Sequence, residues 1–367
     1  MITINHLQTL EQAGRYEEAS QTALRALRST SRAERRDGAV FLIAFMKLVH
    51  FEEILTVLKP EVDQFTNDFV ACNAIAYAAW FRDDVELCRW ASHRCIALNS
   101  AVPEGYLRLG MMELLKQRNV EAFCAFSAGL VNCPKEIASF RVWYKLSKAL
   151  TQGVANVRFV YDNVEFAFHL STFNGHAMET ACQHIQGHFC EEEELRYIQR
   201  FVGHCDSVVE VGAAVGNHTV FFAKILSPKT VHVFDANASA VEHTKANAAL
   251  NCTHAGAPVI NIHHAAVGAK PGSMWLCNQE VTVVRLDDAV QQHVDFIKVD
   301  VDGMEMEVLE GCRGLIARDR PKIMIEVQNE LKERFHAFIR EYDYTIEHEI
   351  VRPVDTNYFI KPKTVAA

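Results

Sequence analysis

The 367-residue sequence lacks several features that would assign it to a class directly. It has no excess of positive charge, since its formal net charge is -9 at pH 7. This charge argues against a protein built mainly to bind nucleic acid or an anionic membrane. Its longest apolar run, residues 39–46, is far short of the ~20 residues that span a bilayer. The N-terminus has no basic and then apolar secretion signal, so we expect a cytoplasmic protein whose partners include neither nucleic acid nor membrane.

Cysteine pairs with metal-binding spacing are absent as well. The eleven cysteines are irregularly spaced and form no C-x-x-C motif, which favours reduced thiols over a disulfide framework or a zinc knuckle. The composition, 49% hydrophobic and 23% charged, is typical of soluble globular proteins. The length predicts two or three domains.

The first 150 residues contain almost no strand-like segments and carry an internal repeat instead. Four segments, residues 14–27, 50–60, 83–98 and 118–134, align on glutamates 33 to 35 residues apart: Glu18, Glu53, Glu86 and Glu121. Apolar residues follow at helical spacing, as in Ala19, Ala23 and Leu27. A period near 34 residues resembles tetratricopeptide repeats. Residues 1–150 are therefore predicted to form a helical repeat domain.

Stacked helix pairs of this kind form a concave surface for a peptide or protein partner. The same array could instead cap the second domain or mediate self-association. The sequence leaves both interpretations open, because the charge pattern of a groove depends on the fold.

From residue 151 onward the pattern changes to that of an α/β domain. Residues 156–171 alternate apolar and polar side chains, with Asp162 and Asn163 as the turn of a hairpin. A helix follows over residues 190–202. Apolar strands then alternate with helical segments up to residue 328, which predicts a mostly parallel sheet wrapped by helices, with ligands at the carboxyl ends of the strands.

The first of these strands runs into the segment EVGAAVGNHT, which contains Gly212 and Gly216. The dinucleotide fingerprint G-x-G-x-x-G is absent because position 214 is alanine, which counts against NAD and FAD. The next strand ends in Asp235, where an acid can accept hydrogen bonds from both ribose hydroxyls. A ribose-binding acid without a diphosphate cradle indicates S-adenosyl-L-methionine. The alternative is that the glycines only ease strand-to-helix packing in another α/β fold.

Residues 191–326 resemble the FkbM family of class I S-adenosylmethionine-dependent methyltransferases. The matching segments are VVEVGAAVGNHTVFFAK, VHVFDAN, KANAALN, HHAAVG, VVRLDDAV, RPKIMIEV and, most specifically, DFIKVDVDGMEMEVLEGC. The resemblance implies a Rossmann-like domain over residues 151–367 with a mostly parallel seven-stranded sheet. Three positions depart from the family pattern. Ala214 stands where asparagine is common, and Asp235 and Asp302 each replace a glutamate.

The resemblance also implies a role for each site residue. The wall beside the methionyl portion would comprise Glu210, Gly212, Ala213 and Gly216. Its amino and carboxylate groups would be reached by Asn217, His218 and Thr219 at a helix start. Asp235 would hold the ribose, with Ala236 and Asn237 beside it, and Ala266 and Val267 would lie against the adenine. Asp300 would lie nearest the sulfonium methyl.

Methyl transfer requires alignment of acceptor, methyl and sulfur, and removal of a proton from a hydroxyl acceptor. Asp300 is the candidate base by position, although it could instead hold the amino group of the cofactor. Lys298 on the same strand could lower its pKa or position the substrate. Mg²⁺ could bind Asp300, Asp302 and Glu326, but nothing in their spacing requires a metal.

Residues 154–190 are predicted to form a hairpin and a segment that covers the acceptor. Its histidines are candidates for substrate contact or proton removal: His169, His176, His184 and His188. The last two also have a metal-like spacing, which Gly187 weakens.

The family resemblance favours oxygen methylation of a sugar or glycoside hydroxyl. The first alternative is methylation of a peptide or protein side chain docked by the repeats. The second is a scaffold that binds the cofactor without turnover.

Overall fold

A computed structural model describes residues 2–13, 15–45, 51–276, 279–352 and 354–363. Three residues of segments singled out above, Gly14, Met46 and His50, lie outside these ranges. The chain divides into two units, Met1–Val154 and Ala155–Ala367. Within the described ranges, every helix is too short or too polar to cross a bilayer.

The first unit is helical throughout its described residues. Its α-helices are α1 (Ile4–Gln12), α2 (Tyr16–Leu27), α3 (Arg32–Phe45), α4 (Phe51–Leu58), α5 (Phe69–Phe81), α6 (Val85–Leu98), α7 (Glu104–Leu115), α8 (Asn119–Asn132) and α9 (Ile137–Thr151). Two short 3-10 helices connect successive helices: η1 (Lys59–Phe65) lies between α4 and α5, and η2 (Pro134–Glu136) lies between α8 and α9. The α5–α6 and α7–α8 turns each contain a residue with positive φ, Asp83 (54°) and Gln117 (57°). Equivalent turns therefore recur at the predicted interval.

Successive helices of this unit pack through glycines. A Cβ added to Gly110 on α7 would lie 2.5 Å from the ring of Phe126 on α8. One added to Gly129 on α8 would lie 2.3 Å from the ring of Phe140 on α9. The phenylalanines therefore occupy the space that a side chain would need. The structure establishes stacked helices, and the assignment to tetratricopeptide repeats stays a prediction.

The second unit is built on a seven-stranded sheet, as predicted. Its strands are β3 (Ser207–Val211), β4 (Thr230–Asp235), β5 (Val259–His264), β9 (Phe296–Val299), β10 (Lys322–Gln328), β11 (Tyr344–Val351) and β12 (Asp355–Pro362). Their order is β11-β12-β10-β9-β3-β4-β5. The pairs from β5 to β10 are parallel, and β12 runs antiparallel to both of its neighbours. The Rossmann-like fold class is therefore confirmed.

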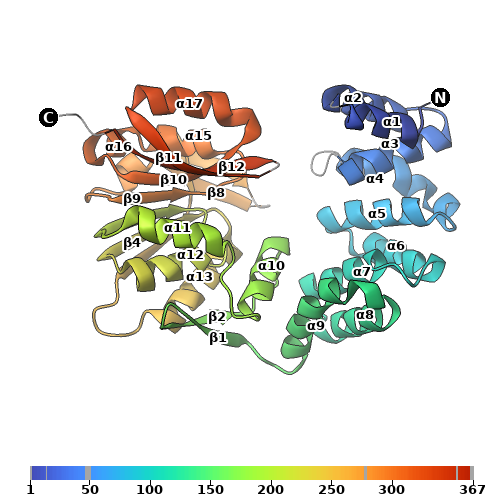
Figure 1. The fold of residues 1–367 in the computed structure, drawn as a ribbon, viewed down its shortest axis with the longest axis horizontal. Helices are drawn as coiled ribbons and strands as arrows, with labels where there is room; N and C mark the ends of the chain where they lie inside the picture. The colour runs from blue at the N-terminus through green and yellow to red at the C-terminus, as the bar shows by residue number, and fades with distance from the viewer. Residues whose placement is uncertain (1, 14, 46–50, 277–278, 353, 364–367) are drawn as a thin grey trace. The chain divides into compact units, whose positions relative to one another are not determined.

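Alternate residues of the central strands serve two cores on opposite faces. Val209 and Ile297 pack with α15 (Glu305–Gly311), α16 (Arg313–Asp319) and α17 (Lys332–Glu341). Val208 and Phe296 pack on the other face with α11 (Glu192–Val202) and α12 (Asn217–Phe221). Each strand is buried on both sides, which explains why it appears in the sequence as a continuous apolar run. Figure 1 shows the helices of this unit around its sheet.

The predicted hairpin is present as β1 (Asn156–Tyr161) and β2 (Val164–His169). Both turn residues have positive φ, Asp162 at 51° and Asn163 at 63°, as a two-residue hairpin turn requires. Helix α10 (Gly175–His184) follows, and α13 (Ala238–Asn251) connects β4 to β5. A second, small sheet, which the sequence did not predict, consists of β6 (Ala266–Val267), β8 (Gln279–Val284) and β7 (Gly272–Leu276).

Candidate functional site

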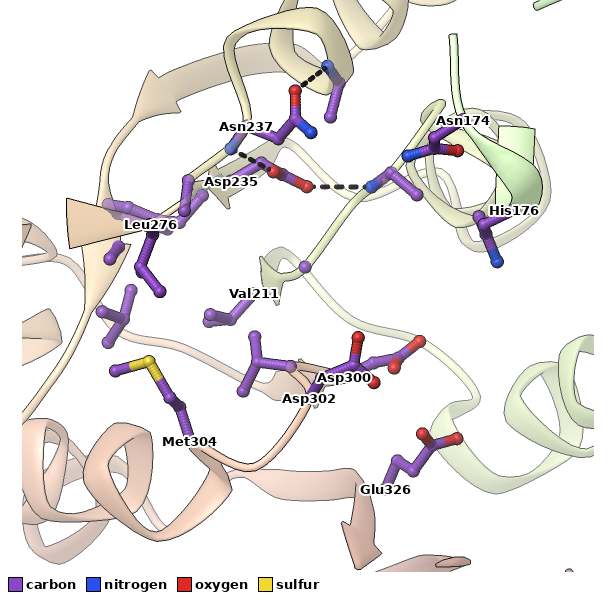
Figure 2. Close-up of a pocket in the computed structure, with 18 of the residues that line it drawn as sticks. Asn174, His176, Val211, Asp235, Asn237, Leu276, Asp300, Asp302, Met304 and Glu326 are labelled. Atoms are coloured by element: carbon purple, nitrogen blue, oxygen red, sulfur yellow. Dashed lines mark hydrogen bonds between the residues drawn. The ribbon is translucent and has the colours of Figure 1, made fainter. Parts of the chain in front are cut away.

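A cavity of about 460 Å³ lies within the second unit at the carboxyl ends of β3, β4 and β9. Ligands of Rossmann-like sheets bind at this edge, and the size is within the range of small-molecule pockets. Val211, Asp235 and Asp300 stand at the three strand ends and line it (Figure 2). The predicted strand-end acids are therefore brought to one cavity.

Gly212 turns the chain where β3 meets this cavity. Its φ is +84°, and an added Cβ would lie 1.8 Å from the backbone oxygen of Asp300. No side chain fits there, so the backbone of the first loop touches the end of β9. Gly216 has a φ of +75° and is the N-cap residue of α12. A Cβ added to it would lie 3.0 Å from Cγ2 of Thr244.

Ala214 also lines the cavity, with a φ of +51°. This left-handed conformation is strained for alanine and easy for glycine or asparagine. The departure from the asparagine common in the family therefore leaves a strained residue beside the site.

Replacing this alanine should relieve the strain. We expect Ala214→Gly to raise the free energy of unfolding by about 0.5 to 1 kcal/mol. The strain of alanine at positive φ costs more than the additional conformational entropy that glycine loses on folding. Urea denaturation measures the change. The control is Ala213→Gly, since Ala213 is buried and has a negative φ; it should lose stability, and a gain of similar size in both variants would contradict this reasoning.

Asp235 ties the loop after β3 to the end of β4. Its Oδ2 accepts hydrogen bonds from the backbone N–H groups of Ala213 (3.0 Å) and Ala214 (2.9 Å). Its Oδ1 accepts one from the N–H of Asn237 (2.8 Å), as Figure 2 shows in part. A carboxylate has about four acceptor sites, so three are used and one remains. A ribose hydroxyl could donate to that remaining site, and the expectation that Asp235 binds both ribose hydroxyls stays a prediction.

One end of the cavity is apolar. It contains Ala266 and Val267 of β6, as the sequence predicted. Phe234, Leu276 and Met304 also line it, and none of the three was predicted from the sequence. Leu276 belongs to β7, a strand that the sequence analysis missed. This end offers apolar walls for a flat aromatic ring.

Lys298 forms hydrogen bonds with both the loop after β3 and Asp300. Its ammonium donates to the carbonyl of Gly212 (2.7 Å) and to Oδ2 of Asp300 (2.9 Å). Burial alone would raise the pKa of Asp300, but the charge and hydrogen bond of Lys298 lower it below the ordinary value. Lys298 itself is buried and does not line the cavity, so of the two roles expected for it, lowering the pKa of Asp300 fits the structure and contact with the substrate does not.

Glu210 lies behind the cavity wall and does not form part of it. It pairs with Lys298 in the sheet register and accepts a hydrogen bond from the Thr219 hydroxyl (2.5 Å). Burial raises the pKa of Glu210 to about 7. Because side chains alternate along β3, Val211 faces the cavity and Glu210 faces α12.

Six of the residues predicted to bind the cofactor do not line the cavity, namely Glu210, Ala213, Gly216, Asn217, His218 and Thr219. The prediction that the start of α12 reaches the methionyl groups therefore needs correction. The amide of Asn217 contacts Nε2 of His184 (2.9 Å) and donates to the carbonyl of Cys190 (2.9 Å). The remaining cofactor-binding predictions line the cavity: Gly212, Asp235, Ala236, Asn237, Ala266, Val267 and Asp300.

The other end of the cavity is acidic. Glu191, Asp302, Glu326 and Arg352 line it with His176. Burial and then the charge of Asp300 raise the pKa of Glu326 to about 8. Glu191 and Arg352 could not be recognised from the sequence, because no spacing motif joins residues so far apart.

The histidine-rich segment separates into several environments. His176 lines the cavity beside Phe173 and Asn174. His184 is buried and stacks on Phe168 at a centroid distance of 3.9 Å, and burial lowers its pKa to about 4. His188 is exposed and lies 3.4 Å from Glu192. His184 and His188, whose spacing suggested a metal site, therefore lie in different environments, one in the core and one on the surface.

Comparisons with known proteins agree with this geometry. Residues 210–346 match the family model described as the methyltransferase FkbM domain, so this part of the chain is a methyltransferase domain. The chain has no match among curated proteins.

Several solved structures resemble the chain. Ribosomal protein L11 methylase from Lactobacillus delbrueckii subsp. bulgaricus is 16% identical over 48% of this chain and 81% of that chain, with a TM-score of 0.36. Methyltransferase FkbM from Methylobacillus flagellatus KT is 17% identical over 60% of this chain and 59% of that chain, with a TM-score of 0.35. TrmK from M. capricolum, solved with S-adenosyl-homocysteine, is 10% identical over 46% and 67%, with a TM-score of 0.33.

Proposed function

We propose that the chain is an S-adenosylmethionine-dependent methyltransferase that methylates a hydroxyl oxygen of a sugar or glycoside. The observation that carries the proposal is one cavity with two unlike ends. Its apolar end fits adenine, the free acceptor site of Asp235 fits a ribose hydroxyl, and the acidic end fits a polar acceptor. The matched methyltransferase domain supports the reaction type.

Asp300 fits the second of the two roles left open by the sequence. Its lowered pKa, caused by Lys298, keeps it anionic and makes it a weak base. An anionic carboxylate at the end of β9 suits the cationic amino group of the methionyl portion. The acidic end then faces the acceptor, where carboxylates accept hydrogen bonds from sugar hydroxyls.

Binding measurements test the proposal at its base. Calorimetry of the full chain with S-adenosylmethionine and S-adenosylhomocysteine should show one site for each. A chain that binds neither would end the enzyme and the scaffold interpretations together. Transfer of a labelled methyl group to a panel of glycosides and peptides then identifies the acceptor class, and transfer to peptides alone would contradict the sugar assignment.

Asp235→Ala should weaken binding of S-adenosylhomocysteine about 10- to 100-fold, the effect of losing one charge-assisted hydrogen bond and the order of the loop. An analogue without ribose hydroxyls separates these two causes. The wild-type chain should prefer S-adenosylhomocysteine over that analogue, and the variant should lose part of the preference. The control is Asp206→Ala, which removes an acid paired with Lys229 on the surface. An unchanged preference in Asp235→Ala would place the ribose elsewhere.

A further inference from the structure

Three side chains outside the proposed cofactor contacts converge where α11 and α12 begin. Glu191 precedes the first residue of α11, Glu194 lies in its first turn, and His218 lies in the first turn of α12. One ligand atom of each lies within 4.8 Å of the other two. They form the only such group of three found among the described residues. We refer to Glu191, Glu194 and His218 as the Glu-Glu-His cluster.

His218 gives this cluster a feature that acids alone would lack. Its side chain is 5% exposed, and its Nε2 has no hydrogen-bond partner among the described residues. That nitrogen lies 3.8 Å from Oε2 of Glu191, beyond the roughly 3.2 Å limit of a good N–H···O bond. A buried polar atom without a partner costs about 1 to 3 kcal/mol. The nitrogen therefore points at the two acids without being satisfied by either.

The imidazole of His218 is a suitable metal ligand. In its neutral form the ring has one nitrogen with a free lone pair. A neutral imidazole nitrogen is a common ligand of divalent transition metals.

Both glutamates of the cluster lie near the guanidinium group of Arg352. Arg352 contacts Oε1 of Glu194 through Nη2 and donates to Glu326 through Nη1 (3.1 Å). It approaches Oε1 of Glu191 at 3.7 Å, whereas Oε2 of Glu191 is directed at His218. One guanidinium thus faces three carboxyl groups, and the second oxygen of Glu191 remains on the side of the imidazole.

We propose that the Glu-Glu-His cluster binds a divalent first-row transition-metal ion. Two ligands each about 2.1 Å from one ion lie roughly 3 to 4 Å apart, which fits the 3.8 Å between Glu191 and His218. An imidazole with two carboxylates suits Mn²⁺, Fe²⁺ or Zn²⁺ better than Mg²⁺, which prefers oxygen ligands throughout. This site differs from the Asp300, Asp302 and Glu326 set considered for Mg²⁺.

Glu191 also lines the cavity, at its acidic end, so the ion would be next to the bound acceptor. A divalent ion at that position can hold an acceptor hydroxyl and lower its pKa, which eases removal of the proton before methyl transfer. This role rests on the proposed function. The binding of the ion does not, because its three ligands come from protein side chains.

The test uses the untagged full chain and Mn²⁺ alone. Mn²⁺ is chosen because thiols prefer softer metals, and Cys124 is exposed. Electron paramagnetic resonance should show one bound ion per chain, and pulsed measurements should show coupling to one imidazole nitrogen. A chain that binds no Mn²⁺ at millimolar concentration, or binds it without nitrogen coupling, overturns the proposal.

Three matched variants locate the site. Glu191→Gln, at a partly exposed position, should weaken Mn²⁺ binding tenfold or more, and His218→Gln should abolish the nitrogen coupling. Glu192→Gln is the control, because Glu192 is the next residue but pairs with Arg196; it should bind as the wild type does. Equal loss in Glu191→Gln and Glu192→Gln, or nitrogen coupling that persists in His218→Gln, would overturn the assignment. Circular dichroism checks the fold of each variant.

S-adenosylhomocysteine binding, measured separately on the same samples, keeps the two proposals apart. Cofactor binding without Mn²⁺ binding would refute the metal site and leave the proposed function intact. Mn²⁺ binding without cofactor binding would do the reverse.

Discussion

Gly212→Ala is expected to destabilise the second unit by about 3 kcal/mol or more, combining the cost of positive φ with overpacking. The new Cβ would meet the backbone oxygen of Asp300 at 1.8 Å. A backbone atom cannot rotate away as a side chain can, so either the loop or the end of β9 must move. Thermal denaturation should show a melting temperature lower by about 6 to 12 °C, and binding of S-adenosylhomocysteine should fall with it.

Gly256→Ala separates the two costs. Gly256 has a φ of +88°, close to that of Gly212, but no atom lies within 4 Å of its added Cβ. This variant should lose only the conformational part, about 1 to 2 kcal/mol. Equal losses in the two variants would show that the contact with Asp300 contributes nothing.

Lys298→Met should destabilise the chain by about 3 to 5 kcal/mol, because it removes the cation beside Asp300 and the fully buried Glu210. Chemical denaturation measures the loss. The double variant Lys298→Met/Glu210→Gln should recover part of it, since it removes one of the unpaired acids. Lys229→Met is the control: its side chain is mostly exposed and pairs with Asp206, so its loss should leave the stability nearly unchanged.

The deficit of Lys298→Met should also depend on pH. Lys298 lowers the pKa of Asp300 and opposes the rise in the pKa of Glu210. Without it, both folded-state pKa values rise. A carboxyl group whose pKa is higher in the folded state than in the unfolded state makes the folded protein less stable as the pH rises. The difference from wild type should therefore be larger at pH 8 than at pH 5, and the opposite trend would contradict the pairing.

Much of the fold followed from local patterns in the sequence. Strands such as β3 and β9 are buried on both faces, so each appears in the sequence as an apolar run that can be recognised without knowing which strands pair with it. Asp162 and Asn163 predicted the hairpin turn because both tolerate positive φ. The antiparallel pair β7 and β8 was missed because its outward-facing positions are exposed, as Trp275 is, and because it belongs to a small sheet separate from the main one.

The site was predictable only where function depends on backbone geometry. Gly212 and Asp235 occupy strand ends, whose place in this fold is fixed. The direction of side chains at the start of α12 was not predictable, and Asn217 turns inward to His184. The acidic end was found only in part. The sequence pointed to His176, Asp302 and Glu326, but not to Glu191 and Arg352, which come from distant parts of the chain and share no spacing motif.

The two ends of the cavity differ in where their residues lie along the chain. The apolar end, with Ala266 and Leu276, lies entirely within the segment that matches the family model, whereas the acidic end also takes His176, Glu191 and Arg352 from either side of that segment. Under the proposed function, variation in the flanking segments can change which molecule is modified while the shared segment continues to hold the methyl donor. Evolution can therefore diversify acceptors on a constant donor-binding framework, as it does when new specificities arise within one enzyme family.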